Sequence, residues 1–172
     1  MAAALVNQLG ILHFQTGRIV QWLINELTGQ RQQGAISGRT PLEQAIGALG
    51  AFINEHYGET LAVPDRWRPK QARMLPLLKP SHKLTIRYEI GPQRVFISEG
   101  AFREWAVKKQ MSPRTLLATL KDNGVIIDYR RNVTLSAGTD IPGARVLCIE
   151  ANASHPVMSG LVAAVQQQDQ SA

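Results

Sequence analysis

The stretch Met111–Gly124, "MSPRTLLATLKDNG", predicts a short helix with a marked start and a marked end. Ser112 is a favourable N-cap, Pro113 suits the first helical position, and Gly124 suits the position just past the last turn. The leucines of this stretch recur at helical spacing and predict its buried face: Leu116, Leu117 and Leu120.

The opposite face of this helix is predicted to be cationic. Arg114, Ala118 and Lys121 follow i, i+4, i+7 spacing, and Thr115 and Thr119 are expected beside them. Small residues between cationic and hydroxyl side chains suit a helix that approaches a groove and contacts phosphates and base edges. A cation near a helix start opposes the helix dipole, so Arg114 favours an anion bound near Ser112.

A preceding helix is predicted to begin after Ser98 and to end near Lys109. Its buried edge consists of Phe102, Trp105 and Ala106. Arg103, Lys108 and Lys109 are its candidate phosphate contacts. For Lys108 and Lys109 the alternative stays open that they only complement the negative end of the helix dipole.

Strand patterns flank these two helices. Residues 83–90 alternate in polarity and 94–98 return as a second short strand, which predicts a hairpin. After Gly124, "VIIDY", "NVTL" and "RVLCIE" are typical of strands. Helix, turn, helix, strand, loop and strand is the order of a winged helix-turn-helix. In the wing, Arg130 and Arg131 are the candidate contacts, because the loop "SAGTDIPGA" carries no cation.

The N-terminal residues predict helices only. A helix is predicted over 16–29, and a second one begins at Thr40 and Pro41 with Glu43 completing a capping box. The second helix carries a continuous apolar stripe: Leu42, Ala45, Ile46, Leu49, Phe52 and Ile53. Two such helices with a short connector are expected to pack as an antiparallel pair.

Four segments follow from these patterns. They are a helical subdomain over 1–60, a basic proline-rich connector over 61–82, a winged-helix domain over 83–150 and a tail over 151–172. The connector holds four prolines, which favour irregular structure. The tail is expected to be loose or to carry one weak helix. The predicted fold class is α+β, mainly helical, with a small antiparallel sheet.

Charge is distributed unevenly along the chain. Of 172 residues with a formal net charge of +6, Arg66–Arg131 holds 15 basic and 5 acidic residues, while the remainder carries a net charge of −4. A basic segment beside an acidic one is expected of a module that meets a polyanion. The alternative is a solvated basic surface. In the connector, Trp67 lies between Arg66 and Arg68 and is either a core residue or a stacking platform for a base.

The sequence contains no pattern typical of catalysis. Phosphate-binding, dinucleotide-binding and nucleophile-elbow motifs are missing, and the four histidines have no partner at zinc spacing. Cys148 is the single cysteine and is expected to be a small core residue in a reducing compartment. No apolar run approaches the length of a membrane span. We therefore expect a cytoplasmic protein, not an enzyme, without cofactor or metal.

Several short motifs resemble the C-terminal region of helicase-like ATPases of unassigned function that prophages and integrative or conjugative elements carry. They include "RIVQWLINELTGQRQQGA", "EQAIGALGAFINEHYGET", "VFISEGAFREWAVKKQMSPRTLLATLKDNGVI" and "IPGARVLCIE". The positions that match are Trp22, Phe52, Ile53, His56, Pro113, Arg114, Pro142, Gly143, Arg145 and Val146. Tyr57 separates His56 from Gly58, which departs from the family pattern. The resemblance implies a role in DNA replication or transfer of a mobile element, with the ATPase located elsewhere.

The leading hypothesis is therefore a DNA-binding domain. Its predicted contacts are Arg103, Lys108, Lys109, Ser112, Arg114, Thr115, Thr119, Lys121, Arg130 and Arg131. About six phosphate contacts predict a log–log salt slope of about −5. The alternative is a protein-interaction module that docks on the parent ATPase or on a replication partner.

Overall fold

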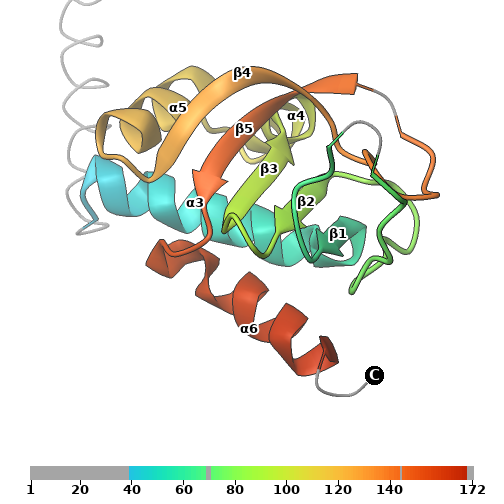
Figure 1. Cartoon of the computed structure of the whole chain (residues 1–172). Coiled ribbons are helices and arrows are strands. Elements are labelled where there is room, and N and C mark those ends of the chain that lie inside the picture. Colours follow the sequence, from blue (N-terminus) through green and yellow to red (C-terminus); the bar gives the residue numbers. More distant parts are fainter. Residues whose placement is uncertain (1–38, 69–70, 144, 170–172) are drawn as a thin grey trace, which may run out of the picture. The chain divides into compact units, whose positions relative to one another are not determined.

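The computed structural model describes residues 39–68, 71–143 and 145–169 (Figure 1). All its helices and strands belong to one unit that begins at Pro41. In chain order they are α3 (Pro41–Glu55), η1 (Tyr57–Glu59), β1 (Thr60–Val63), β2 (Ile86–Glu89), β3 (Arg94–Ser98), α4 (Glu99–Lys108), α5 (Pro113–Asp122), β4 (Ile126–Thr134), β5 (Arg145–Asn152), η2 (Pro156–Met158) and α6 (Ser159–Asp169). The α+β class is confirmed. The helix predicted over 16–29, and with it the N-terminal pair, lies outside the described residues.

One mixed sheet joins the five strands in the order β1-β2-β3-β5-β4. β1 pairs with β2 in parallel, and the other neighbours are antiparallel. The predicted hairpin is confirmed as β2 and β3, with Ile86 opposite Ile97. The small antiparallel sheet predicted for 83–150 is therefore present as β2, β3, β5 and β4, and β1, at the start of a connector predicted to be irregular, adds a parallel edge strand.

The two faces of the sheet differ in their chemistry. Alternation along the strands directs Ile86, Tyr88, Val95 and Ile149 toward the helices, where they join the main core. The other face carries Arg87 and Glu89 of β2, whose side chains are 1% and 5% exposed. The polar face of this strand is therefore buried as well. The loop after β4 covers it, since Arg87 donates to the carbonyl oxygens of Leu135 and Ala137 at 2.8 Å each.

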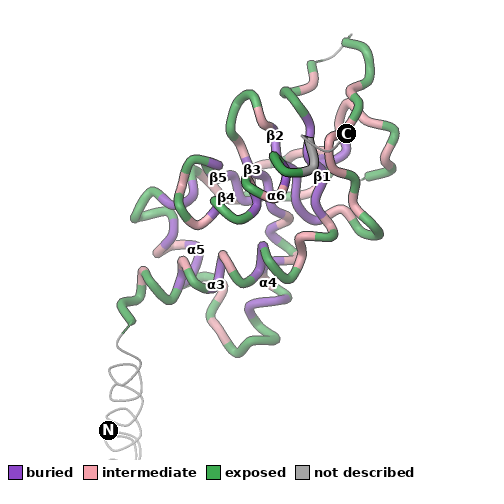
Figure 2. Tube along the Cα trace, turned by 90° about the horizontal axis from the view of Figure 1, so that it is seen from below, coloured by how far each residue is buried: buried purple, intermediate pink, exposed green. Residues whose placement is uncertain are grey.

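Helix α3 packs along the apolar face, with α6 beside it (Figure 1). The predicted stripe of α3 is confirmed at its centre, where Ala45, Leu49, Phe52 and Ile53 are buried. Rings from two helices meet there: Phe52 of α3 contacts Phe102 and Trp105 of α4 edge to face at centroid distances of 5.3 and 5.6 Å. Figure 2 shows buried positions in the strands and exposed ones on the outer turns of α3.

The last described segment is a helix. Leu161 and Val165 of α6 are buried in the main core together with Met158 of η2. These apolar contacts explain why a stretch with few strong helical signals forms a helix, which is the weak helix that the sequence allowed for the tail.

Candidate nucleic-acid interface

The helix predicted from the opening stretch is α5. Ser112 caps it, its Oγ accepting from the N–H of Thr115 at 3.4 Å, and Pro113 takes the first helical position. Leu116, Leu117 and Leu120 are buried as predicted. Local sequence alone explains the start of the helix and its inward face.

Arg114 and Lys121 lie on the same side of α5. Both are exposed, and both have Tyr129 of β4 as a neighbour: Arg114 lines a cleft with it, and the Lys121 Nζ lies 5.2 Å from its ring centroid. At 3.6 residues per turn, Thr115 and Thr119 are turned about 130° away from this pair. The threonines are therefore on the opposite flank of the helix from the cations, and Ala118 and Asp122 lie between the two groups.

An irregularity in β4 presents the neighbouring side chains to α5. The register between β4 and β5 shifts between Asp128 and Arg131, and Arg130 between them has φ of +72°. A bulge of this kind redirects side chains, and left-handed backbone is uncommon for a residue other than glycine. It brings Tyr129 and Arg130 to the side of β4 that faces α5, and the Arg130 guanidinium lies 5.9 Å from the Tyr129 ring centroid.

Three arginines from three elements meet at this place. Arg103 of α4, Arg114 of α5 and Arg130 of β4 line a cleft of about 370 Å³ together with Leu117 and Tyr129. We call this site the three-arginine cleft. No acidic residue is among its lining residues. Within the described chain, Arg114 and Arg130 have no ion pair, so their guanidinium groups are available to an anion.

Arg103 is held by a carboxylate of its own helix. Its Nε and Nη2 both lie 2.7 Å from Oε1 of Glu99, one turn earlier. Glu99 is 4% exposed, and its Oε2 has no hydrogen-bond partner among the described residues. Arg103 therefore neutralises a buried acid as well as lining the cleft.

Three other predicted contacts are occupied by intramolecular ion pairs. Lys109 pairs with Glu55 at 2.9 Å, Lys121 pairs with Asp128 at 2.9 Å, and Arg131 pairs with the buried carboxylate of Glu150. Hydrogen bonds from Lys109 and then from Trp105 lower the pKa of Glu55. The hydrogen bond between Lys121 and Asp128 raises the pKa of the lysine and lowers that of the acid. The three carboxylates neutralise the positive charge of these side chains, which weakens their attraction for a phosphate.

The remaining predicted residues have separate surroundings. Lys108 is exposed at the end of α4 and is not among the residues that line the cleft. The hydroxyl of Thr115 donates to Ser112 Oγ at 3.0 Å, so these two side chains satisfy one another. Asn123 donates to the backbone oxygen of Thr119 at 2.8 Å, and the Thr119 side chain is half-buried.

Tyr129 is the cleft residue that sequence reasoning missed. The sequence pattern allows the end of a strand or a turn there, and the aromatic ring next to the arginines was the available signal. The loop 135–143 carries no cation, as predicted, and it is held in place by Arg87, by an ion pair of Asp140 with Arg73 and by a hydrogen bond of 2.7 Å from Met74 N–H to Gly138 O.

Comparison with known proteins finds no matching family model, no matching curated protein and no matching solved structure. In the described ranges, no three His, Cys, Asp or Glu side chains are grouped as metal ligands. Within the same ranges, none of the helices has the length and apolarity needed to cross a membrane.

Proposed function

We propose that this chain binds DNA through the three-arginine cleft and the adjoining face of α5. The observation that carries the proposal is the convergence of Arg103, Arg114 and Arg130 beside the capped start of α5. Guanidinium groups bind phosphate oxygens in a bidentate manner, and the start of a helix adds favourable dipoles. Leu117 and Tyr129 contribute apolar surface to the same cleft, and the Arg130 guanidinium lies 5.9 Å from the Tyr129 ring centroid.

The order of elements supports a winged-helix architecture for this surface. β3, α4, α5, β4 and β5 follow one another in the order strand, helix, helix, strand and strand, and β3 pairs with β5 rather than with β4. α3 precedes them and is separated from β3 by η1, β1 and β2. In such domains the second helix of the pair is the one that enters the major groove. This assigns the recognition role to α5, with β4 placed beside it. β1 and β2 extend the sheet on its far side.

The resemblance of the short motifs to mobile-element ATPases supports a more specific role. We propose that the DNA-binding domain serves replication or transfer of such an element, with the ATPase activity supplied by another domain or partner. In that setting, Arg114 follows Pro113 at the start of the helix that the family motif shares.

The decisive experiment measures DNA affinity after removal of two cleft arginines. Arg114→Ala/Arg130→Ala is preferred over substitution of Arg103, because Arg103 also neutralises buried Glu99. Fluorescence anisotropy with a labelled 20-base-pair duplex at low salt is expected to show a loss of affinity of about tenfold or more, since each arginine forms charge-assisted hydrogen bonds.

The matched control is Lys79→Ala/Lys83→Ala. Both lysines are exposed and lie in the segment between β1 and β2, at the far edge of the sheet from β4. This variant removes the same charge and is expected to change affinity less than about twofold. Equal losses of DNA affinity in the two double variants would mean that binding depends only on net charge, and they would overturn the assignment of the binding site to the cleft. If the wild-type protein retained a helicase-like ATPase domain in a pull-down but bound no DNA, that result would favour the docking alternative.

A further inference from the structure

A second groove lies on the sheet face that the helices do not cover. Its volume is about 440 Å³, and the residues that line it come from the connector, from β2, β3, β4 and β5, and from the loop after β4. Among them are Arg66, Trp67, Arg87, Glu89, Arg131 and Arg145. We call it the sheet groove. None of the three arginines of the cleft lines it.

Trp67 packs against the backbone of the loop 135–143. A side chain at Gly138 would collide with the Cβ, Cγ and Cδ1 atoms of Trp67, so the tryptophan packs directly on that glycine. Gly138 has φ of +80°, which also favours glycine there. The Nε1 of Trp67 donates to the backbone oxygen of Gln71 at 3.4 Å. The indole is thus positioned at the groove while remaining partly exposed.

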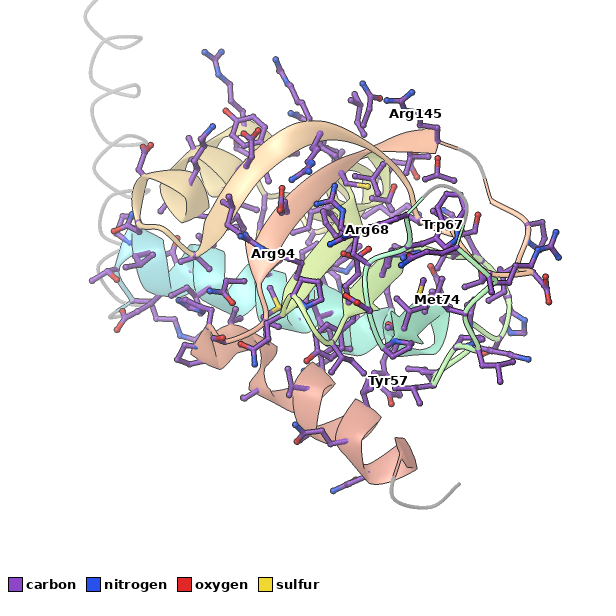
Figure 3. The ribbon with its side chains drawn as sticks, in the orientation of Figure 1. Tyr57, Trp67, Arg68, Met74, Arg94 and Arg145 are labelled. Carbon is purple, nitrogen blue, oxygen red and sulfur yellow. The ribbon has the colours of Figure 1, made fainter. Side chains whose placement is uncertain are left out.

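The charges of the groove divide into paired and unpaired groups. Arg87 and Glu89 pair at 2.8 Å in its floor, and Arg131 pairs with Glu150. Arg66 and Arg145 line the groove, are exposed, and have no ion pair within the described residues. The side chains that line the groove therefore carry a net positive charge. Trp67 and Arg145, both labelled in Figure 3, line this groove.

We propose that the sheet groove binds a single-stranded nucleic acid, with a base stacked on Trp67 and the backbone phosphates held by Arg66 and Arg145. Flat aromatic rings beside cations on a sheet are the elements of sequence-tolerant single-strand binding. A duplex keeps its bases stacked inside, so a partly exposed indole gains little from it. The preformed seat of Trp67 on Gly138 reduces the ordering cost of binding. This site does not depend on the three-arginine cleft.

The experiment compares two 10-nucleotide probes with the same phosphates, oligo-dT and an oligonucleotide of abasic sites, by fluorescence anisotropy. Wild-type protein is expected to bind oligo-dT about tenfold more tightly than the abasic probe, the scale of one stacked base. Trp67→Ala is expected to bind both probes equally weakly. Trp67→Phe, which keeps an aromatic ring against Gly138, is expected to retain most of the preference.

Tryptophan emission gives a second measurement that does not depend on stability. The chain has three tryptophans, and Trp105 is only 7% exposed. Quenching of emission by oligo-dT is expected in wild type and is expected to be much smaller in Trp67→Phe. Equal quenching in the two proteins, or no preference of wild type for oligo-dT over the abasic probe, would overturn the proposal. Competition by polyglutamate as strong as by oligo-dT would assign the groove to acidic peptides instead.

Duplex binding separates this inference from the proposed function. Trp67→Ala is expected to leave duplex affinity unchanged, and Arg114→Ala/Arg130→Ala is expected to leave the base preference unchanged. Loss of the base preference in the cleft variant would mean that the single strand lies in the cleft, which overturns the assignment to the groove. Unchanged duplex affinity in the cleft variant would refute only the proposed function.

Discussion

Arg87 and Glu89, two residues apart on β2, form a buried ion pair with Nε 2.8 Å from Oε1. The same guanidinium donates to the carbonyl oxygens of Leu135 and Ala137, so one side chain joins an inner strand to the loop after β4. A buried charge is tolerated only when such partners replace water. The pair therefore fixes the position of the loop that seats Trp67.

Arg87→Met is expected to lower the free energy of unfolding by about 3–5 kcal/mol, because it leaves Glu89 buried without its partner and two carbonyl groups unsatisfied. Urea unfolding followed by circular dichroism measures the change. Arg87→Met/Glu89→Gln is expected to recover part of the loss, since it removes the uncompensated charge. A loss below about 1 kcal/mol in the single variant would contradict the structural role of the pair.

Arg130→Gly is expected to raise stability and to weaken DNA binding. The φ of +72° costs an ordinary residue roughly 1–2 kcal/mol, and glycine avoids that cost. Thermal unfolding and anisotropy with the duplex give the two readouts. Gln110→Gly is the control, because Gln110 is exposed with φ of +58° and does not line the cleft. The control is expected to gain stability and to keep its affinity; equal loss of affinity in both variants would refute the role of Arg130.

The salt dependence of duplex binding is expected to be shallower than the sequence implied. Three phosphate contacts in the cleft predict a log–log slope of about −3 instead of about −5. Asp128→Asn releases Lys121 from its ion pair and is expected to steepen the slope by about 0.9, because one more cation then meets the DNA. Titrations at four or more salt concentrations measure both slopes. An identical slope in wild type and Asp128→Asn would show that Lys121 does not reach the DNA.

The ion pair of Lys121 and Asp128 predicts a pH window for its contribution to stability. The pKa of Asp128 is lowered, so its contribution is present above the unfolded value near 3.8 and is lost as the pH falls through the folded value. The pKa of Lys121 is raised, so its contribution is present below about 10.5 and is lost as the pH rises through the folded value. NMR titration of the Asp128 carboxyl is expected to show the low pKa in wild type and a return toward 3.8 in Lys121→Ala. No difference between the two proteins would disprove the pair.

Cys148 is expected to be inert toward thiol reagents in the folded protein. It is buried, and burial, followed by the charge of Glu99, raises its pKa to about 12. Only the thiolate reacts, so labelling by a disulfide reagent at pH 8 is expected to be slow in native protein and stoichiometric in denaturant. Because Cys148 is the single cysteine, all of the labelling comes from this residue and no cysteine-free variant is needed. Rapid labelling of native protein would contradict the buried position of β5 at this residue.

Several predictions from sequence depended only on neighbours along the chain. The cap at Ser112, the three inward leucines of α5 and the β2–β3 hairpin are set by local hydrogen bonding and by periodicity, and all are confirmed. Arg87 and Glu89 occupy polar positions of an alternating pattern, which is typical of a strand face exposed to solvent. Nothing local indicated that a loop about fifty residues later would bury them.

The sequence by itself therefore determined α3, α4, α5 and the β2–β3 hairpin, though not β1, and it determined that the central part of the chain is strongly basic. Only the tertiary structure decided which of those basic side chains remain available. Three of them form ion pairs within the described chain: Lys109 with Glu55, Lys121 with Asp128 and Arg131 with Glu150. Arg114 and Arg130 line one cleft and have no such partner among the described residues. The physical reason is that an ion pair depends on distance in space, and packing of α3, α5, β4 and β5 sets those distances.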